Sequence, residues 1–159
     1  MRKVFANTIM NNQLSIYKSR ILRHPKIIWT ILKNVPTLDP LVIFMNAPVY
    51  MMFRNETLVS FVSIKHWGNQ TEFGTLYTFP DERGKGYAKD LCIEVMKDYG
   101  LLYLLCKPDM VELYSENGFS IDQAPSGIMG MRKRLFDIFI APFVGYTIVV
   151  MKRNQNHHI

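Results

Sequence analysis

The stretch Phe79-Pro80-Asp81-Glu82-Arg83-Gly84-Lys85-Gly86-Tyr87-Ala88 lies between a segment of strand character and a segment of helical periodicity. Gly84 and Gly86 allow the backbone to bend sharply and to approach a ligand closely. The N–H groups of the first helical turn have no partner inside the helix, and the helix dipole favours an anion there. Because Arg83 and Lys85 add positive charge, the stretch predicts a site for phosphate or diphosphate.

Two familiar phosphate-binding loops do not fit this stretch. A P-loop requires Gly-Lys followed by Ser or Thr, whereas Lys85 is followed by Gly86. The dinucleotide-binding fingerprint requires Gly-x-Gly-x-x-Gly, and Lys89 occupies the position of its third glycine. Taken alone, the loop leaves open the alternative of a glycine-rich turn with solvated charges.

The residues after the loop predict an amphipathic helix that leads into a buried strand. Apolar residues recur every three or four positions from Ala88 to Tyr99, and charged residues occupy the other side. Gly100 suits the end of the helix, and the uninterrupted apolar run Leu101–Cys106 predicts a central buried strand. A short helix over Pro108–Glu116 is expected next.

Strand-like runs lie on both sides of this central part. Upstream, runs over residues 49–53, 58–65 and 72–79 are separated by two turn segments, which predicts an antiparallel meander. Downstream, residues 119–121 and 145–152 are expected to form further strands.

The first forty residues predict two helices. Leu14, Tyr17 and Ile21 recur at helical spacing, and Pro25 suits the first turn of a second helix. Residues 125–144 look like an insertion before the last strand, and they are candidates to cover part of a substrate site.

The chain has 159 residues, of which 48% are hydrophobic and 20% charged, and its formal net charge is +6. That length favours one domain over residues 1–159, and that composition excludes a disordered chain. Two cysteines, Cys92 and Cys106, cannot build a disulfide-dense scaffold and show no metal-ligand spacing. The positive excess indicates an anionic partner without specifying its chemistry.

Neither end of the chain carries a clear targeting signal. Val4–Met10 is interrupted by polar residues and no cleavage site follows, so no signal peptide is expected. The apolar run Leu135–Met151 contains Asp137 and Pro142, which favours a buried strand and a connector over a membrane span. We therefore expect a cytoplasmic protein with reduced thiols and no membrane partner. Because the basic residues are scattered, no nucleic-acid partner is expected either.

Two short motifs carry a family resemblance. Arg83-Gly84-Lys85-Gly86-Tyr87-Ala88 matches the pattern Arg/Gln-x-x-Gly-x-Gly/Ala, and Leu113-Tyr114-Ser115-Glu116-Asn117-Gly118-Phe119 resembles Leu/Phe-Tyr-x-x-x-Gly-Phe. Both patterns belong to the GCN5-related N-acetyltransferase (GNAT) superfamily, and the resemblance covers roughly residues 48–122. It implies an α/β (α+β) fold, the acyl-CoA N-acyltransferase fold. Such a fold has a central mixed, mostly antiparallel sheet flanked by helices, with a splay between two parallel strands.

The resemblance implies acetyl-CoA as co-substrate and gives roles to the loop and to the strand before it. The loop amides would hold the CoA pyrophosphate, and the residues concerned are Arg83, Gly84, Lys85, Gly86, Tyr87 and Ala88. The backbone of Leu76, Tyr77 and Thr78 would hold the pantetheine arm in the gap beside Leu101–Cys106. A backbone N–H near Leu76 or Tyr77 would polarise the thioester carbonyl, as in an oxyanion hole.

Two proton-transfer residues are also implied by the resemblance. Tyr114 lies at the motif position that the family uses as general acid toward the leaving CoA thiolate. The acceptor amine must be neutral to attack, and Glu72 is the nearest candidate base, because family bases often lie on this strand. His66 is a second candidate, since imidazole titrates near neutral pH. Cys106 is a candidate to line the site, although direct transfer needs no acylated cysteine.

The sequence therefore predicts an N-acetyltransferase that transfers the acetyl group of acetyl-CoA to a primary amine in a ternary complex. A GNAT-like module that binds acyl-CoA without turnover is the alternative, because an asparagine found in many relatives is absent after Cys106. The acceptor is expected to be a small-molecule or peptide amine, a homodimer is left open, and no metal is expected.

Overall fold

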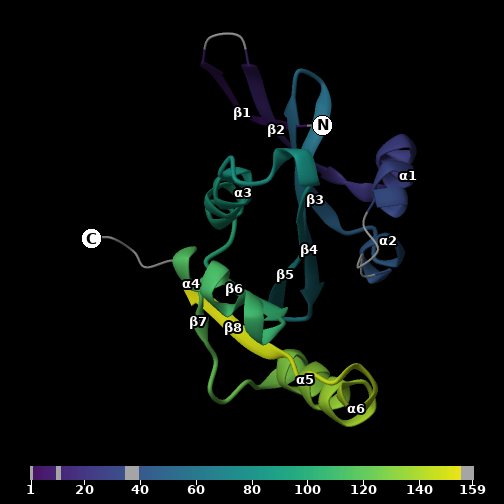
Figure 1. Ribbon diagram of the computed structural model, residues 1–159, viewed down its shortest axis with the longest axis vertical. Helices are drawn as coiled ribbons and strands as arrows, with labels where there is room; N and C mark the ends of the chain where they lie inside the picture. The colour runs from purple at the N-terminus through teal and green to yellow at the C-terminus, as the bar shows by residue number, and fades with distance from the viewer. Residues whose placement is uncertain (1, 10–11, 35–39, 155–159) are drawn as a thin grey trace. The chain divides into compact units, whose positions relative to one another are not determined.

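The computed structural model describes residues 2–9, 12–34 and 40–154 (Figure 1). The chain forms two compact units, one comprising Met1–Lys65 and Phe73–Val95, and the other comprising His66–Glu72 and Met96–Ile159. The expectation of one domain over residues 1–159 stays a prediction.

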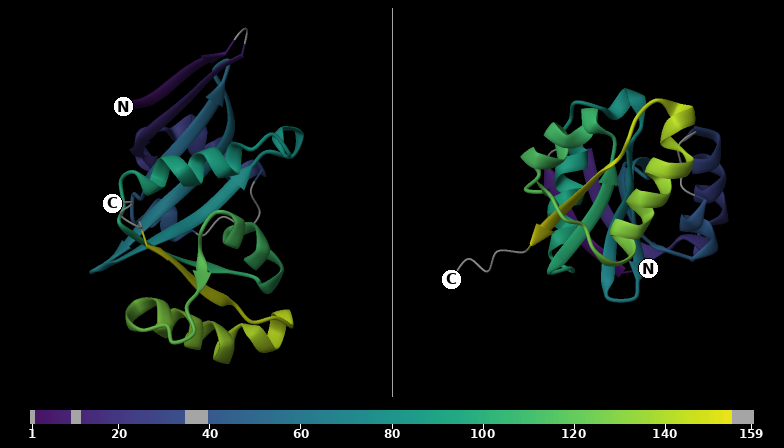
Figure 2. Two further views of the ribbon diagram at one scale, coloured as in Figure 1. Left: turned by 90° about the vertical axis from the view of Figure 1, so that its left-hand side faces the viewer. Right: turned by 90° about the horizontal axis from the view of Figure 1, so that it is seen from below.

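The first unit is built on neighbouring strands with helices on both faces. Its strands follow the order β1 (Arg2–Ile9), β2 (Asn12–Arg20), β3 (Pro48–Arg54), β4 (Thr57–Trp67) and β5 (Gln70–Thr78), the last two of which continue into the other unit. Its helical segments are η1 (Ile21–Arg23), α1 (Pro25–Asn34), α2 (Leu41–Phe44), η2 (Pro80–Glu82) and α3 (Tyr87–Met96). Helices α1 and α2 lie on one face of the strands, and α3 lies on the other (Figures 1 and 2).

Two tight turns form the predicted meander. Between β3 and β4, Asn55 and Glu56 both have positive φ angles, of 48° and 67°, as a type I′ hairpin turn requires. Between β4 and β5, Gly68 has a φ of 60° in a two-residue connection. A connection this short joins adjacent strands only in the antiparallel sense. The predicted meander over residues 49–79 is therefore confirmed.

The apolar core of the first unit lies between its N-terminal helices and the sheet. Ile21, Ile31, Val49, Met51 and Phe61 form a buried cluster, and each is at most 2% exposed. Burial of such side chains is the main stabilising contribution here, about 1.5–3 kcal/mol for each one.

The second unit contains the start of β5 and three further strands. Its strands are β6 (Leu101–Cys106), β7 (Ser120–Ile121) and β8 (Val149–Asn154). Its helical segments are η3 (Pro108–Met110), α4 (Val111–Glu116), α5 (Gly127–Phe139) and α6 (Ala141–Val144). Glu72 on β5 pairs in parallel with Tyr103 on β6, whereas β8 pairs antiparallel with both β6 and β7.

The strand order across the described residues is β1-β2-β3-β4-β5-β6-β8-β7. One parallel pair among antiparallel neighbours, with helices beside the strands, confirms the predicted fold class. The splay between β5 and β6 stays a prediction. Strand β6 lies between two other strands, as predicted for a central strand, but its side chains alternate between buried and more exposed and Leu101 is exposed, so its burial is only partial.

The prediction of a helix at Leu14–Ile21 is wrong. These residues form most of β2, in which Leu14 to Arg20 pair antiparallel with β3. Its ladder partners are β1, which directly precedes it, and β3, which follows α2 in the chain, and this pairing overrides the helical spacing of the apolar residues. The next helix begins at Pro25, as predicted.

The expectation of a buried strand and a connector over Leu135–Met151 is only partly correct. The run remains helical through α5 and α6, and Gly145 ends α6 in the left-handed conformation with a φ of 74°. The last strand therefore begins at Val149 rather than at 145. Across the described parts of the chain, no helix is long and apolar enough to span a membrane.

Candidate functional site

The glycine loop of the first unit is open to solvent and ends at the start of α3. Gly84 and Gly86 have φ angles of 75° and 82°, and no atom lies within 4 Å of where a Cβ would stand on either. The first hydrogen bond of α3 runs from the N–H of Asp90 to the carbonyl of Gly86, over 3.1 Å. The amides of Tyr87 and Ala88 precede that bond, so the helix itself offers them no acceptor. The loop is thus shaped to receive an anion at backbone N–H groups.

The two loop cations are held by the loop itself. Lys85 donates from Nζ to the carbonyl of Asp81 at 3.0 Å and to the carboxylate of Glu82 at 2.9 Å. Glu82 also forms an ion pair with Arg54 on β3. Arg83 donates from Nε to the carbonyl of Thr78 at 3.2 Å. These contacts tie the loop to β5 and occupy both cationic side chains.

Strand β5 leads into this loop through Leu76, Tyr77 and Thr78, which are half-buried. The hydroxyl of Ser60 on β4 donates to the carbonyl of Tyr77 at 2.9 Å and lies 2.9 Å from the hydroxyl of Thr78. The Tyr77 ring lies 6.0 Å from the ring of Phe61, between centroids. The side chains of this strand are therefore fixed against β4.

In the second unit, Glu72 lies in a small polar cluster. Its carboxylate accepts a hydrogen bond from Trp67 Nε1 at 2.6 Å and forms an ion pair with Arg132 on α5. The Arg132 guanidinium also lies over the Trp67 ring, 5.0 Å from the centroid. The Glu72 side chain is only 5% exposed, and a buried carboxylate is costly unless it is paired and hydrogen-bonded. Sequence reasoning found Glu72 but missed both partners.

A second link between the β4–β5 hairpin and α5 was also missed. The side chain of Gln70 accepts from the backbone N–H of Met129 at 3.1 Å and donates to the carbonyl of Ser126 at 3.2 Å. Gly127, with a φ of 62°, allows this approach, because a Cβ there would lie 2.8 Å from the Gln70 side-chain oxygen. The sequence offered no signal for this link, because Gln70 lies between the polar residues Asn69 and Thr71.

Tyr114 belongs to the same unit, and its contacts give a structural reason for the other residues of its motif. Its ring, 8% exposed as a residue, packs edge-on against Phe119, with centroids 5.9 Å apart. Gly118, with a φ of 81°, turns the chain at the end of α4 so that the N–H of Phe119 bonds the carbonyl of Tyr114 at 3.0 Å. The Tyr-x-x-x-Gly-Phe motif therefore has a structural role, because it ends helix α4, in addition to providing the phenol group of Tyr114.

The remaining candidates have different surroundings. His66 is exposed, with its ring 5.8 Å from that of Tyr99. Cys106 is buried and donates to the sulfur of Met151 at 3.7 Å. Burial first, and then the charge of Asp109, raises the pKa of the Cys106 thiol from 9.0 to about 11, so it is an unreactive thiol. Among the described residues, no group of three or more His, Cys, Asp or Glu side chains is placed to hold a metal ion.

Three solved structures illustrate the similarity of this fold to known proteins. Arabidopsis thaliana Naa50, solved with the bisubstrate analogue CoA-Ac-MVNAL, has a TM-score of 0.65 at 15% identity, over 89% of this chain and 98% of that one. The IAA acetyltransferase from Bacillus cereus has a TM-score of 0.64 at 16% identity, over 89% and 99%. A GNAT family acetyltransferase from Elizabethkingia anophelis with acetyl-CoA bound has a TM-score of 0.56 at 13% identity, over 92% and 99%.

Because the sequence identities are this low, the similarity to these structures shows the fold alone. No curated protein matches the chain. The sequence itself carries the decisive match, because residues 20–119, well over half of the chain, match the acetyltransferase (GNAT) family. The loop motif and the Tyr114 motif both lie inside that range. The chain therefore belongs to the acetyltransferase (GNAT) family.

Proposed function

We propose that this protein is an N-acetyltransferase that transfers the acetyl group of acetyl-CoA to a primary amine. The observation that carries the proposal is the glycine loop, where Gly84 and Gly86 expose the unpaired amides of α3 to an anion. In the proposed complex, the pyrophosphate lies on the amides of residues 83–88 and the pantetheine arm follows the backbone of Leu76, Tyr77 and Thr78.

The proposed reaction is one direct displacement. The neutral amine attacks the thioester carbonyl, a C–N bond forms, and the C–S bond breaks. A backbone N–H near Leu76 or Tyr77 stabilises the negative charge that develops on the carbonyl oxygen. Holding both substrates in one complex supplies much of the remaining rate enhancement. Cys106 takes no part, which agrees with its buried thiol.

Two side chains carry the protons in this proposal. Glu72 accepts the proton that the attacking amine loses, directly or through water, and its ion pair with Arg132 orients the carboxylate. Tyr114 donates its hydroxyl proton to the departing CoA thiolate, as general acid. The proton that Tyr114 loses is restored from solvent after the products leave.

One observation favours a second candidate function. Trp67 and Arg132 both donate hydrogen bonds to Oε2 of Glu72, so that oxygen is already occupied before an amine arrives. A module that holds acyl-CoA without turnover would need the loop and would not need a base. Thiol release from acetyl-CoA, measured over a panel of primary amines, separates the two, because only an enzyme releases CoA.

The pyrophosphate site is tested by a pair of matched glycine variants. Gly84→Ala and Gly145→Ala introduce the same methyl group at nearly the same φ, 75° and 74°, in open space. Both should lose about 1 kcal/mol of stability, because L-residues are strained in that conformation. Acetyl-CoA at a hundred times Kd should raise the stability of the wild type and of Gly145→Ala by about 2.7 kcal/mol. For Gly84→Ala, acetyl-CoA should raise the stability by a smaller amount. If millimolar acetyl-CoA does not stabilise the wild type, the proposed function is refuted.

A further inference from the structure

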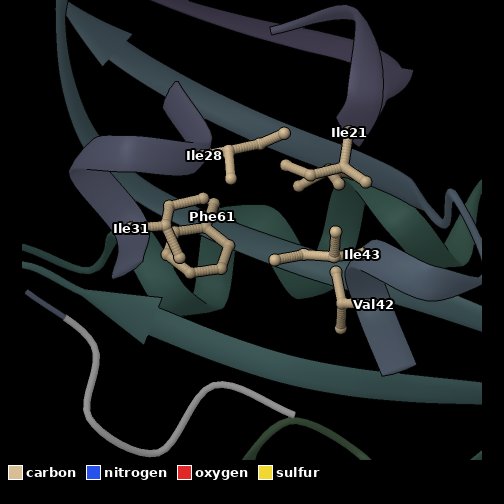
Figure 3. Close-up of a pocket in the computed structure, with 7 residues that line it drawn as sticks. Ile21, Ile28, Ile31, Val42, Ile43 and Phe61 are labelled. Carbon is tan, nitrogen blue, oxygen red and sulfur yellow. The ribbon is translucent and has the colours of Figure 1, made fainter. Parts of the chain in front are cut away.

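The helices η1, α1 and α2 cover one face of the strands in the first unit. Figure 3 shows Ile28 and Ile31 of α1 and Ile43 of α2 pointing into the core beside Phe61 of β4. The inward sides of these helices therefore belong to the core. Their outward sides face solvent, and we call the exposed side chains of η1, α1 and α2 the N-terminal helix surface.

The three segments lie side by side. His24 alone separates η1 from α1. The N–H of Leu22 on η1 donates to Oδ1 of Asn46, two residues after α2, at 3.2 Å. Arg20 also donates, from Nη1, to the carbonyl of Asn46 at 3.1 Å. The exposed side chains of the three segments therefore form one surface.

The N-terminal helix surface carries several large apolar side chains. Trp29 and Leu32 on α1 are 61% and 51% exposed. Phe44 on α2 is 84% exposed, and Leu22 on η1 is exposed as well. Such residues scattered singly are ordinary, whereas a group of them on neighbouring helices marks a binding surface. Tryptophan is typical of the boundary between water and lipid, since its ring is apolar and its N–H is polar.

Basic side chains lie among these apolar ones. Arg23 on η1 and Lys26 and Lys33 on α1 are exposed. The Lys33 ammonium lies over the Trp29 ring, 5.1 Å from its centroid. Among the described residues, no carboxylate forms an ion pair with Arg23, Lys26 or Lys33, so their charges are available to a partner. The first acidic residue of the chain is Asp39, and seven lysine and arginine residues precede it.

Charge distinguishes this surface from a second exposed apolar surface, on α5 and α6 of the other unit. There, Ile138, Phe139 and Phe143 are all at least 64% exposed. That unit has seven basic and seven acidic residues, whereas the first unit has twelve basic and six acidic residues. The N-terminal helix surface therefore joins apolar side chains to a net positive charge, and the surface on α5 and α6 does not.

We propose that the N-terminal helix surface binds the surface of a membrane that contains anionic lipids. Arg23, Lys26 and Lys33 meet the negative headgroups, while Trp29 and Phe44 enter the boundary between headgroups and acyl chains. The sequence-based expectation of no membrane partner rested on the run Leu135–Met151 as a possible span. Binding at the membrane surface needs no spanning segment, so that reasoning does not apply to these helices.

Two other partners fit the same surface less well. A second copy of the chain, related by a twofold axis, would place the same positive side chains against one another. Nucleic acid would bind the basic residues but would leave the exposed leucines and Phe44 without apolar contacts. Anionic lipid satisfies both kinds of side chain.

The test is co-sedimentation of the full-length protein with vesicles. One set contains phosphatidylcholine alone, and the other contains equal parts of phosphatidylcholine and phosphatidylglycerol. Each basic residue near an anionic surface strengthens binding about fivefold, so the protein should bind the second set at least about tenfold more tightly. Salt at about 1 M should remove most of that preference by screening. Equal binding to both sets, or binding to neither, overturns the proposal.

Two matched pairs of charge variants locate the electrostatic contribution. Lys26→Gln combined with Lys33→Gln should weaken binding to anionic vesicles about thirtyfold. Lys89→Gln combined with Lys107→Gln removes two exposed charges from other parts of the chain and should weaken it much less. Because all four side chains are exposed, each variant should retain the Tm of the wild type. Equal weakening in the two pairs refutes the assignment to this surface.

A matched pair of phenylalanine variants locates the apolar contribution. Phe44→Ala should weaken vesicle binding about tenfold, because its ring no longer leaves water. Phe143→Ala makes the same change on α6, at 88% exposure against 84% for Phe44, and should leave binding unchanged. If Phe143→Ala weakens binding as much as Phe44→Ala does, the surface has been assigned to the wrong helices.

The fluorescence of Trp29 reports insertion directly. On anionic vesicles its emission should move to shorter wavelength and should be quenched by brominated acyl chains. Trp29→Phe retains Trp67 and should lose most of this response. Vesicle binding without any response of Trp29 means that another surface is in contact with the lipid, and it overturns the proposal.

The competing partners have measurements of their own. If the protein without vesicles is a dimer that Phe44→Ala dissociates, the surface binds a second copy and the proposal is wrong. If a DNA duplex binds more tightly than anionic vesicles and independently of Phe44, the surface binds nucleic acid and the proposal is again wrong. None of these assays contains acetyl-CoA or an amine, so failure of the proposed function and failure of this inference are distinguishable.

Discussion

Removal of Arg132 should destabilise the protein far more than removal of its neighbour Lys133. Both residues lie on α5, have similar helix propensities and form an ion pair with a carboxylate. The partners differ, because the side chain of Glu72 is 5% exposed and that of Asp137 is 33% exposed. Breaking a buried pair costs about 3–5 kcal/mol, whereas an exposed pair four residues apart contributes about 0.3–0.5 kcal/mol.

The stability lost in Arg132→Ala should lie at the lower end of the range for a buried pair. The Arg132 side chain is 23% exposed, so water can partly replace it beside Glu72. We therefore expect a loss of about 3 kcal/mol, equivalent to a fall of about 6–12 °C in Tm for a chain of this length. Lys133→Ala should lower Tm by about 1–2 °C.

The assay is thermal and urea unfolding of the two single variants and of Arg132→Ala combined with Glu72→Gln. The double variant should recover more than half of the loss, because the unpaired buried charge is gone. Equal losses for Arg132→Ala and Lys133→Ala, or no recovery in the double variant, would refute the view that Arg132 compensates a buried carboxylate.

Three further outcomes follow from single residues. Gln70→Ala leaves the buried N–H of Met129 without its acceptor and should cost about 1–3 kcal/mol in urea unfolding, whereas Asn69→Ala in the exposed turn should cost little. Tyr114→Phe keeps the ring packing on Phe119, so kcat should fall while the acetyl-CoA thermal shift is unchanged. The Cys106 thiol should resist iodoacetamide at pH 8 until the protein is unfolded, since its pKa is about 11. As the pH rises, the Cys106 thiol loses its proton in the unfolded protein before it does so in the folded protein. The free energy of unfolding should therefore fall between pH 9 and pH 11, and Cys106→Ala should lessen that fall.

The parts of the fold that could be predicted are those in which the signal is local. The two positive-φ glycines and the helical period after them lie within one short stretch, so sequence alone identified the loop and α3. The turn at Gly68 likewise lies between the strands that it joins. The strand β2 was mispredicted because its apolar residues happen to recur at helical spacing, whereas its pairing with β1 on one side and β3 on the other holds it extended.

The polar cluster around Glu72 could not be predicted, because its members lie far apart in the sequence. Arg132 lies 60 positions after Glu72, and Met129 lies 59 positions after Gln70. Gln70 and Glu72 are both buried, and burying either group without a partner is costly. Nothing in the spacing says which of the 19 lysine and arginine side chains, or which backbone amide, will be the partner, and only the packing of α5 against the strands decides it.

The two cations of the loop have different partners from those that the sequence suggested. The sequence suggested that Arg83 and Lys85 would meet the phosphates, but both side chains bond groups of the loop and of β5. A phosphate held mainly by backbone amides gains from fixed geometry and from the helix terminus, and it depends less on mobile side chains. Raising the salt concentration should therefore weaken acetyl-CoA binding only moderately, and Lys85→Met should act chiefly by loosening the loop. If affinity instead fell tenfold or more between low salt and physiological salt, free cations elsewhere on the basic unit would have to supply the missing attraction.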